Sequence, residues 1–429
     1  MLESEILIPE NEKAEQFTQA MEYIEDGMYE EACDILANLT RSFPDDRGIW
    51  WQYGGILRRA RRYDTADEVA DTCYRLFPDD PGFVLGWTRC FDARADWDQC
   101  IERRREVLKT IDPRQDHRFL PLITECFLPL VETKNFDELK RLVNAYWDTL
   151  IEEDSCGAAV YYALESIADF ERQIELCEGI MSRHDYDDCI IEGVNYLNLK
   201  SLAQSALVNS RNYAKSGTMP MVLSIGQSCL PYTVANRWGL LSYVGDPNVS
   251  VFDLGAFGNN SAVVALKSDF ATYLDPTTYF KRSDHVGAPQ MHHRPTGVHF
   301  GHERGRSIIG DDDKKFHTLI RKKIDTFRSR FEKGNVLLVY GIVGGVDLPA
   351  FVAEIGEYLD RTGATLFIVN FTRDALDCPA HSHVRFAHIP FPVDYNWNDI
   401  AHFTADRGFA FDHRFVSALI CEMERLKLD

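Results

Sequence analysis

The sequence lacks the signals that would assign it quickly to several common classes of protein. No apolar run reaches the roughly 18 residues that a membrane-spanning helix needs, so no membrane span is expected. Residues 1–15 are acidic and lack the apolar stretch of a secretory signal. The 11 cysteines are scattered, without a C-x-x-C pair or a Cys/His cluster at zinc spacing, so no metal is expected. Dispersed, odd-numbered cysteines are typical of a reducing compartment, and we expect a cytoplasmic protein.

Positive charge is also scarce, because 67 acidic side chains face 46 basic ones and the formal net charge is -21. A surface of this charge repels phosphate backbones, so nucleic acid is not expected as a partner. Neither G-x-x-x-x-G-K-[ST] nor a G-x-G-x-x-G motif after an apolar strand occurs. No nucleotide or other cofactor is therefore expected.

A repeat of constant step organises the first part of the chain. The tetrapeptide Phe-Pro-Asp-Asp occupies residues 43–46 and again residues 77–80. Three further sets of residues keep the same step. Small or near-small residues stand at Ala20, Gly54 and Thr88, aromatic residues at Tyr29, Tyr63 and Trp97, and small residues again at Ala32, Ala66 and Cys100. This pattern is similar to the tetratricopeptide repeat, in which small residues lie where two helices cross and proline follows the second helix. A looser fourth unit is predicted at residues 117–150, after a slip of five residues.

We expect residues 1–153 to form a tetratricopeptide-like solenoid of helical hairpins. Residues 154–217 are expected to add further hairpins or a cap and to end in a linker, and residues 218–429 to form an α/β domain. Stacked hairpins expose a concave groove, so the expected partner of this region is a protein or peptide bound in that groove.

After residue 217, apolar runs alternate with helical patterns. This order predicts a doubly wound, mostly parallel sheet, in which a ligand lies beyond the carboxyl ends of the strands. Strands are predicted at 221–225, 249–254, 298–300, 336–340, 365–370 and 384–389, and helices at 229–238, 314–333, 348–361 and 411–428.

The turn after the first of these strands is the first candidate site. Its residues are Ser224-Ile225-Gly226-Gln227-Ser228-Cys229. A thiol at the start of a helix is favoured as a thiolate by the helix dipole, which also stabilises an oxyanion. The alternative is a tight turn with a small buried cysteine. A glycine- and asparagine-rich loop after the second predicted strand supplies candidate oxyanion donors, or is an ordinary turn: Gly255, Gly258 and Asn260.

Two histidines are candidate general bases. His302 follows a predicted strand and has Glu303 beside it, which suits a base with an acid. The nearby His285, His292 and His293 leave the choice of histidine open. Asp399 and His402 form a second acid–base pair three residues apart, or Asp399 simply caps the last helical region.

In the order of these motifs, residues 221–402 resemble a family of largely uncharacterised domains described as papain-like cysteine peptidases. The matching blocks are 224–229, Phe252-Asp253-Leu254, Asp269-Phe270, His302-Glu303, the basic helix with the buried strand at 314–340, and Trp397. The departures are Leu254 in place of tryptophan, Glu303 in place of aspartate, and the lack of an arginine after the strand at 336–340. The resemblance implies Cys229 as nucleophile and His302 as base in a hydrolase or acyltransferase.

A second resemblance is to the SGNH esterases and acyltransferases. Gly226-Gln227-Ser228, the following loop and Asp399-x-x-His402 match their blocks in order, although Val343 stands where an asparagine is expected. This implies Ser228 as nucleophile with His402 as base and Asp399 orienting it, acting on an ester such as an acylated saccharide. A third possibility is a non-catalytic scaffold, in which the repeats bind a partner and the α/β domain is a degenerate enzyme.

Overall fold

The computed structural model describes residues 8–184, 189–214, 219–241, 249–253, 257–258, 261–283, 288–310 and 312–428. The chain divides into two compact units. One contains residues 1–129 with 284–288, and the other residues 130–283 with 289–429. Within the described ranges, no helix combines the length and apolar character that crossing a bilayer requires.

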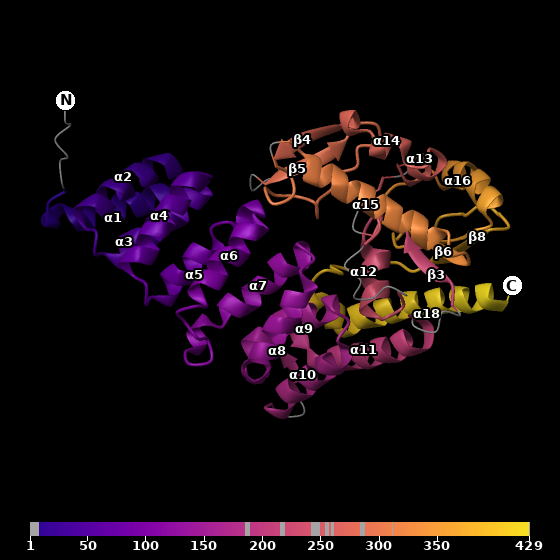
Figure 1. The fold of residues 1–429 in the computed structure, drawn as a ribbon, viewed down its shortest axis with the longest axis horizontal. Helices are drawn as coiled ribbons and strands as arrows, with labels where there is room; N and C mark the ends of the chain where they lie inside the picture. Colours follow the sequence, from indigo (N-terminus) through magenta and orange to yellow (C-terminus); the bar gives the residue numbers. More distant parts are fainter. Residues whose placement is uncertain are drawn as a thin grey trace. The chain divides into compact units, whose positions relative to one another are not determined.

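Helical hairpins make up the first unit and continue into the second (Figure 1). The second helix of each hairpin starts at an aromatic residue: Tyr29, Tyr63, Trp97, Phe136 and Phe170. The steps between these starts are equal except for the one from Trp97 to Phe136, so the repeat slips once, by five positions, and then resumes. The helices are α1 (Glu10–Glu25), α2 (Tyr29–Ser42), α3 (Arg47–Arg59), α4 (Tyr63–Leu76), α5 (Pro81–Arg89), α6 (Trp97–Val107), α7 (Pro121–Glu132), α8 (Phe136–Glu152), α9 (Gly157–Ser166) and α10 (Phe170–Ser182).

The same turn closes every hairpin. One residue of each turn has a positive φ, and the backbone N–H that follows it donates to the carbonyl five positions earlier, over 2.8–3.1 Å. This is the left-handed end that terminates many helices, where glycine is preferred because it has no Cβ. Only the first hairpin uses glycine; the five turn residues are Gly27, Arg61, Ala95, Lys134 and Ala168.

The predicted repeat positions lie in the cores of the hairpins. Ala32, Ala66 and Cys100 are buried, as their place at a helix crossing requires. Asp46 and Asp80, the last residues of the two repeated tetrapeptides, accept hydrogen bonds from backbone N–H groups at the starts of α3 and α5. Each tetrapeptide therefore ends one hairpin and begins the next.

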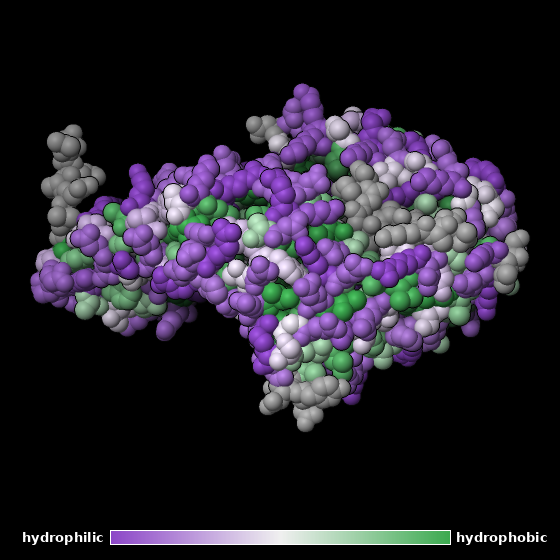
Figure 2. All heavy atoms as spheres, turned by 60° about the horizontal axis from the view of Figure 1, so that its bottom comes forward, coloured by the Kyte–Doolittle hydropathy of each residue, from purple (hydrophilic) through white to green (hydrophobic). Residues whose placement is uncertain are grey.

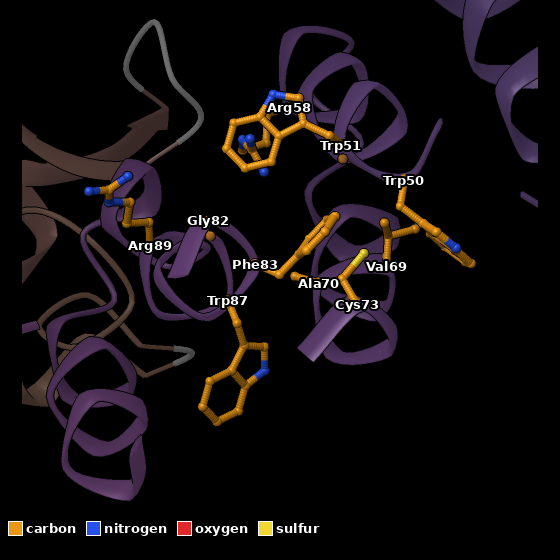
Figure 3. A pocket seen from close by; sticks show the side chains of 12 residues that line it. Trp50, Trp51, Arg58, Val69, Ala70, Cys73, Gly82, Phe83, Trp87 and Arg89 are labelled. Carbon is orange, nitrogen blue, oxygen red and sulfur yellow. The ribbon is translucent and has the colours of Figure 1, made fainter. Parts of the chain in front are cut away.

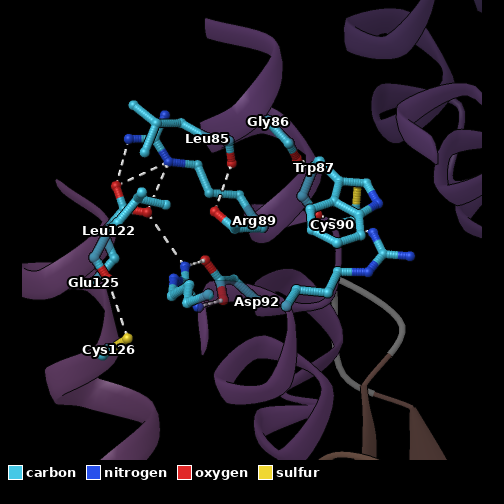
Figure 4. A network of polar contacts seen from close by, with 12 residues as sticks. Leu85, Gly86, Trp87, Arg89, Cys90, Asp92, Leu122, Glu125 and Cys126 are labelled. Carbon is cyan, nitrogen blue, oxygen red and sulfur yellow. Dashed lines mark hydrogen bonds and ion pairs between the residues drawn. The ribbon is translucent and has the colours of Figure 1, made fainter. Parts of the chain in front are cut away.

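Buried arginines link successive hairpins of the first unit. The fully buried Arg104 pairs with Asp92 at 2.8 Å and with Glu125 at 3.2 Å, and Glu125 also pairs with Arg89 (Figure 4). A buried guanidinium is tolerated only with such partners, so these pairs fix how neighbouring helices align.

Hydrophilic side chains cover most of the face shown in Figure 2, with small hydrophobic areas between them.

The second unit contains a four-stranded parallel sheet in the order β3-β6-β7-β8. The helices α15 and α16 lie on one face, and α12 and α18 on the other (Figure 1). Both faces are covered, so β6 and β7 are buried along their whole length. The elements are β3 (Met221–Ser224), α12 (Leu230–Arg237), α15 (Lys314–Phe331), β6 (Val336–Ile342), α16 (Leu348–Thr362), β7 (Thr365–Asn370), β8 (Val384–His388) and α18 (Asp406–Leu428).

A doubly wound sheet reverses its strand order at a switch point. The four described strands follow chain order, so they contain no such reversal. The coarser prediction, helical hairpins followed by an α/β part with a parallel sheet, is confirmed.

Two predicted strands are wrong in their described residues. Residues 249–253 form a coil and a turn instead of a strand, because Asp253 folds back to accept a hydrogen bond from the Ser250 N–H at 2.6 Å. Residues 298–300 contribute only an isolated bridge between His299 and His292. The strand that His292 belongs to, in the antiparallel pair β4 (Tyr279–Ser283) and β5 (Pro289–His293), was not predicted.

Shorter elements complete the second unit. The antiparallel pair β1 (Ile190–Ile191) and β2 (Val194–Asn195) precedes the long helix α11 (Tyr196–Asn209), which packs against α10. The others are α13 (Ser261–Lys267), α14 (Ala271–Leu274) and α17 (Ile400–Thr404).

Candidate active site

The turn between β3 and α12 is shaped by a close approach of two strands. A Cβ on Gly226 would lie 2.7 Å from the backbone nitrogen of Gly341, at the end of β6. A Cβ on Gly341 would lie 2.9 Å from the Pro231 ring of α12. Both positions therefore require glycine, and together they hold the start of α12 over the carboxyl ends of β3 and β6. Cys229 occupies the residue just before α12 and is partly exposed.

His302 contacts Cys229. Burial disfavours ionisation of the Cys229 thiol, but a hydrogen bond and the charge of His302 outweigh it and lower the thiol pKa. The interaction with Cys229 and the carboxylate of Glu132 raise the pKa of His302 to about 9, against the effect of burial. These opposite shifts favour a thiolate–imidazolium pair, which is the reactive form of a nucleophilic cysteine.

Glu132 is the carboxylate that faces the imidazole. Its Oε1 lies 3.9 Å from Nδ1 of His302, and the Glu132 side chain is mostly buried. Burial alone would raise the pKa of Glu132, but the imidazolium of His302 lowers it. No sequence motif pointed to this residue, because it belongs to α7 of the fourth hairpin and lies far from both Cys229 and His302 in the sequence.

Glu303, the neighbour of His302 in sequence, has a different partner. Its Oε1 forms an ion pair with Lys323 of α15, and both side chains are almost fully buried. The acid expected beside the base is therefore neutralised by a lysine. Its charge still acts on His302 at longer range.

Two further polar side chains lie near the sulfur. Trp397 and Thr233 both help to lower the pKa of Cys229. The Trp397 carbonyl accepts a hydrogen bond from Nη2 of Arg237 at 2.7 Å, and the Trp397 ring stacks on Phe391. The indole N–H is buried and has no hydrogen-bond partner within the described structure.

Backbone donors lie at the same turn. Among the described residues, the N–H groups of Ser228 and Cys229 have no hydrogen-bond acceptor. Free N–H groups at a nucleophile are the donors that an oxyanion hole requires. Gln227 supports the turn instead, since its side-chain oxygen accepts from the N–H groups of Val343 and Gly344 at 3.0 and 3.1 Å.

The residues of the SGNH hypothesis are placed apart from this arrangement. Ser228 is buried, and its Oγ accepts a hydrogen bond from the Leu230 N–H at 3.3 Å. Asp399 caps α17 by accepting from the Ala401 N–H and lies 3.8 Å from the partly exposed His402. Within the described part of the chain, no hydrogen bond or ion pair joins His402 or Asp399 to Ser228.

The predicted oxyanion loop is only partly described. Gly255 and Asn260 lie outside the described residues, and the carbonyl of Gly258 accepts from the Ser261 N–H. His285 is also outside them. His293 is fully buried, stacks on Tyr273 and hydrogen-bonds to Thr296, so it is a core residue. The described residues contain no group of three or more His, Cys, Asp or Glu side chains that could hold a metal ion.

The first unit has its own candidate site, an apolar groove of about 220 Å³ formed by α3, α4 and α5 (Figure 3). Trp51 and Phe83 meet edge to face with ring centroids 6.0 Å apart, and Trp51 is 54% exposed. Gly86 also lines the groove, where a Cβ would contact nothing within 4 Å. No carboxylate is among the lining residues, and the exposed Arg58 has no ion-pair partner in the described structure.

Comparison with known proteins adds no assignment: no family model matches the chain, and no curated protein is similar to it.

Proposed function

We propose that the protein is a cysteine-dependent hydrolase or acyltransferase, with Cys229 as nucleophile and His302 as general base and acid. The contact of His302 with both Cys229 and Glu132 carries this proposal, because it joins a thiol, a base and an acid from three distant segments. The position of Cys229 at the start of α12 and the free backbone N–H groups beside it support the same role.

The chemistry follows from these positions. The Cys229 thiolate attacks the carbonyl carbon of an acyl substrate, and the carbonyl oxygen becomes an oxyanion that the Ser228 and Cys229 N–H groups stabilise. The tetrahedral intermediate then expels the leaving group, which takes the proton from the His302 imidazolium. His302 next removes a proton from water, or from an acceptor alcohol or amine. The resulting nucleophile attacks the thioester and expels the Cys229 thiolate with release of the acyl product, and the proton taken from the acceptor stays on His302 beside the restored thiolate.

Ser228 remains the alternative nucleophile, as in the SGNH hypothesis. Its Oγ is engaged by the Leu230 N–H, and the described structure offers it no histidine, so the contacts favour Cys229. A non-catalytic scaffold is the other alternative. It predicts no acyl transfer at all and no activated thiol.

The test is a burst assay with p-nitrophenyl acetate, a small activated ester. We expect a stoichiometric release of nitrophenol that Cys229→Ala abolishes and Ser228→Ala retains. A burst that survives in Cys229→Ala but not in Ser228→Ala would replace this proposal with the serine mechanism. The absence of a burst together with an inert Cys229 thiol would favour the scaffold.

We further propose that the hairpins of the first unit bind an apolar peptide segment that carries a carboxylate. The groove offers exposed aromatic surface from Trp51 and a cation, Arg58, but no carboxylate of its own. Such a lining is complementary to apolar side chains next to an acidic one. We also propose that the repeat is of the tetratricopeptide type.

This binding is tested by fluorescence anisotropy with labelled Leu-Phe-Leu-Leu peptides that end in a carboxylate or an amide. We expect Arg58→Ala to weaken binding of the carboxylate form about tenfold, the effect of losing about 1.4 kcal/mol. Arg61→Ala is the matched control, because Arg61 is exposed but does not line the groove. Equal binding of the two peptides would contradict the proposal.

A further inference from the structure

We infer that Glu132, the last residue of α7, is the positioning acid of the Cys229–His302 pair. The fourth hairpin, at a residue that belongs to the second unit, thereby supplies part of the candidate active site of that unit. This inference rests on the proposed function, because a positioning acid has meaning only if His302 acts on Cys229. Beyond the proposed function, we assign the acid to Glu132 and the element that carries it to α7.

The geometry around His302 selects Glu132 over Glu303. The Glu132 carboxylate lies 3.9 Å from Nδ1 of the imidazole, within ion-pair range. The Glu303 carboxylate is held by Lys323, and both of those side chains are 6% exposed. A carboxylate whose charge is already neutralised by a buried lysine stabilises a second cation less strongly, so Glu132 is the better partner of the imidazolium.

The local fold explains why Glu132 is held in place. Pro129 lies inside α7, where it removes one helical hydrogen bond, and the two compact units divide directly after it. The residues that follow, including Glu132, therefore belong to the unit that contains Cys229. The Asn135 N–H donates to the Leu130 carbonyl at 2.8 Å, and Lys134 adopts the left-handed conformation between them. This closed turn fixes the backbone on both sides of Glu132.

The chemical consequence is an orienting role. A carboxylate beside one imidazole nitrogen holds the ring in one orientation and tautomer and stabilises its protonated form. Because the imidazolium in turn stabilises the thiolate, loss of the Glu132 charge raises the pKa at which Cys229 becomes reactive. The nearby Lys134, whose pKa is lowered mainly by burial, is a cation or neutral and cannot take the place of the Glu132 carboxylate.

The experiment is the pH dependence of Cys229 alkylation by iodoacetamide in the full chain, read by mass spectrometry. We expect Glu132→Gln to raise the apparent pKa of Cys229 by about one unit. This corresponds to about tenfold slower alkylation at pH values well below that pKa. Glu132→Asp keeps the charge and is expected to restore most of the wild-type profile.

Two control variants make the result specific. Glu25→Gln is matched to Glu132→Gln, because each glutamate stands two positions before the left-handed turn residue of its hairpin. Glu303→Gln tests the acid next to His302 in sequence. Neither is expected to move the pH profile of Cys229 by more than a few tenths of a unit.

The outcomes separate this inference from the proposed function. A wild-type Cys229 that titrates in the ordinary thiol range would overturn the proposed function. A low thiol pKa that Glu303→Gln raises and Glu132→Gln leaves unchanged would overturn only the assignment of Glu132. If Glu132→Gln lowers the melting temperature sharply, the pH profiles of Glu132→Asp and Glu303→Gln are compared with that of wild type. A wild-type profile in Glu132→Asp supports the assignment of Glu132, and a shift in Glu303→Gln alone overturns it.

Discussion

The helical hairpins and the surroundings of Cys229 assemble their charged side chains in different ways. In the hairpins, buried arginines pair with acids of the same or the neighbouring hairpin, as Arg104 does with Asp92 and Arg94 with Asp67. Around Cys229, the partners Glu132 and His302 come from segments that are far apart in the sequence. Structure in the hairpins is thus set locally and repeated, whereas the candidate site depends on single long-range contacts that nothing repeats.

The largest effect is expected where a long-range buried contact is removed. Arg237 of α12 is 1% exposed and pairs with the fully buried Asp412 at 3.2 Å and with Glu165 at 3.9 Å. Arg237→Met leaves two buried carboxylates without a cation and should lower the free energy of unfolding by about 3–5 kcal/mol. Urea denaturation measures this loss.

The loss should also depend on pH. Burial raises the pKa of both Glu165 and Asp412, so their charged forms are the ones that the variant destabilises. Stability should therefore fall further as the pH rises from 5 to 8. Arg183→Met removes a partly exposed ion pair with Asp154 and serves as control, with an expected loss below about 1 kcal/mol. Equal losses in both variants would show that the buried long-range ion pair contributes no more to stability than a partly exposed one.

The next effect is on the reactivity of Cys229. His302→Gln removes the cation that offsets burial of the thiol, so the thiol pKa should rise. Alkylation of Cys229 at pH 6.5 should slow about 100-fold, the effect of a shift of about two units. His299→Gln, at an exposed histidine shortly before His302, is the matched control and should leave the rate unchanged. An unchanged rate in His302→Gln would show that the His302 imidazole does not activate Cys229.

A smaller effect is expected from overpacking a helix crossing. Ala66 is 2% exposed at a position that repeats as Ala32 and Cys100. Ala66→Leu should lower the free energy of unfolding by about 1–3 kcal/mol, because the crossing has no room for the added carbons. Ala14→Leu, at an exposed position of α1, should change it by less than about 0.5 kcal/mol. Thermal denaturation of both variants tests whether the repeat position or the side chain alone matters.

The smallest effect is expected at a helix cap. The Asp80 carboxylate accepts from the Gly82 N–H at 2.9 Å at the start of α5. Asp80→Ala should cost about 1 kcal/mol of stability, whereas Asp79→Ala, one position earlier and exposed, should cost little. If the two variants are equally stable, the repeated Asp-Asp pair does not act as a cap.

The hairpins and the main strands were predictable because their signals are local. The constant step of the repeat located the hairpins, and the bounds of β7 were predicted to the residue from one apolar run. For residues 154–217 either further hairpins or a cap was expected, and the repeat step of the fifth hairpin was not recognised, although Phe170 follows Phe136 by the same step that separates Tyr29 from Tyr63. The helix α9 of that hairpin is apolar on most sides, which hid the repeat.

The site was less predictable, because an acid next to the base in sequence is not its partner in the folded chain. The pair His302-Glu303 suggested its own acid, but the two side chains point to different partners. Glu132 carries no signal in the sequence, since an acid at a helix end is common and its partner comes from a distant part of the chain. Only the folded chain brings these groups together.

The most direct test of the central claim is the rate of alkylation of Cys229 as a function of pH, compared with the other cysteines of the same chain. We expect a Cys229 thiolate that forms well below the ordinary thiol pKa of about 8.5. Turnover of an amide substrate, whose amine leaving group needs a proton from His302, should decline above about pH 9, where His302 loses that proton. A Cys229 as inert as Cys73, whose thiol pKa burial raises to about 12, would contradict the claim that this turn carries a nucleophile.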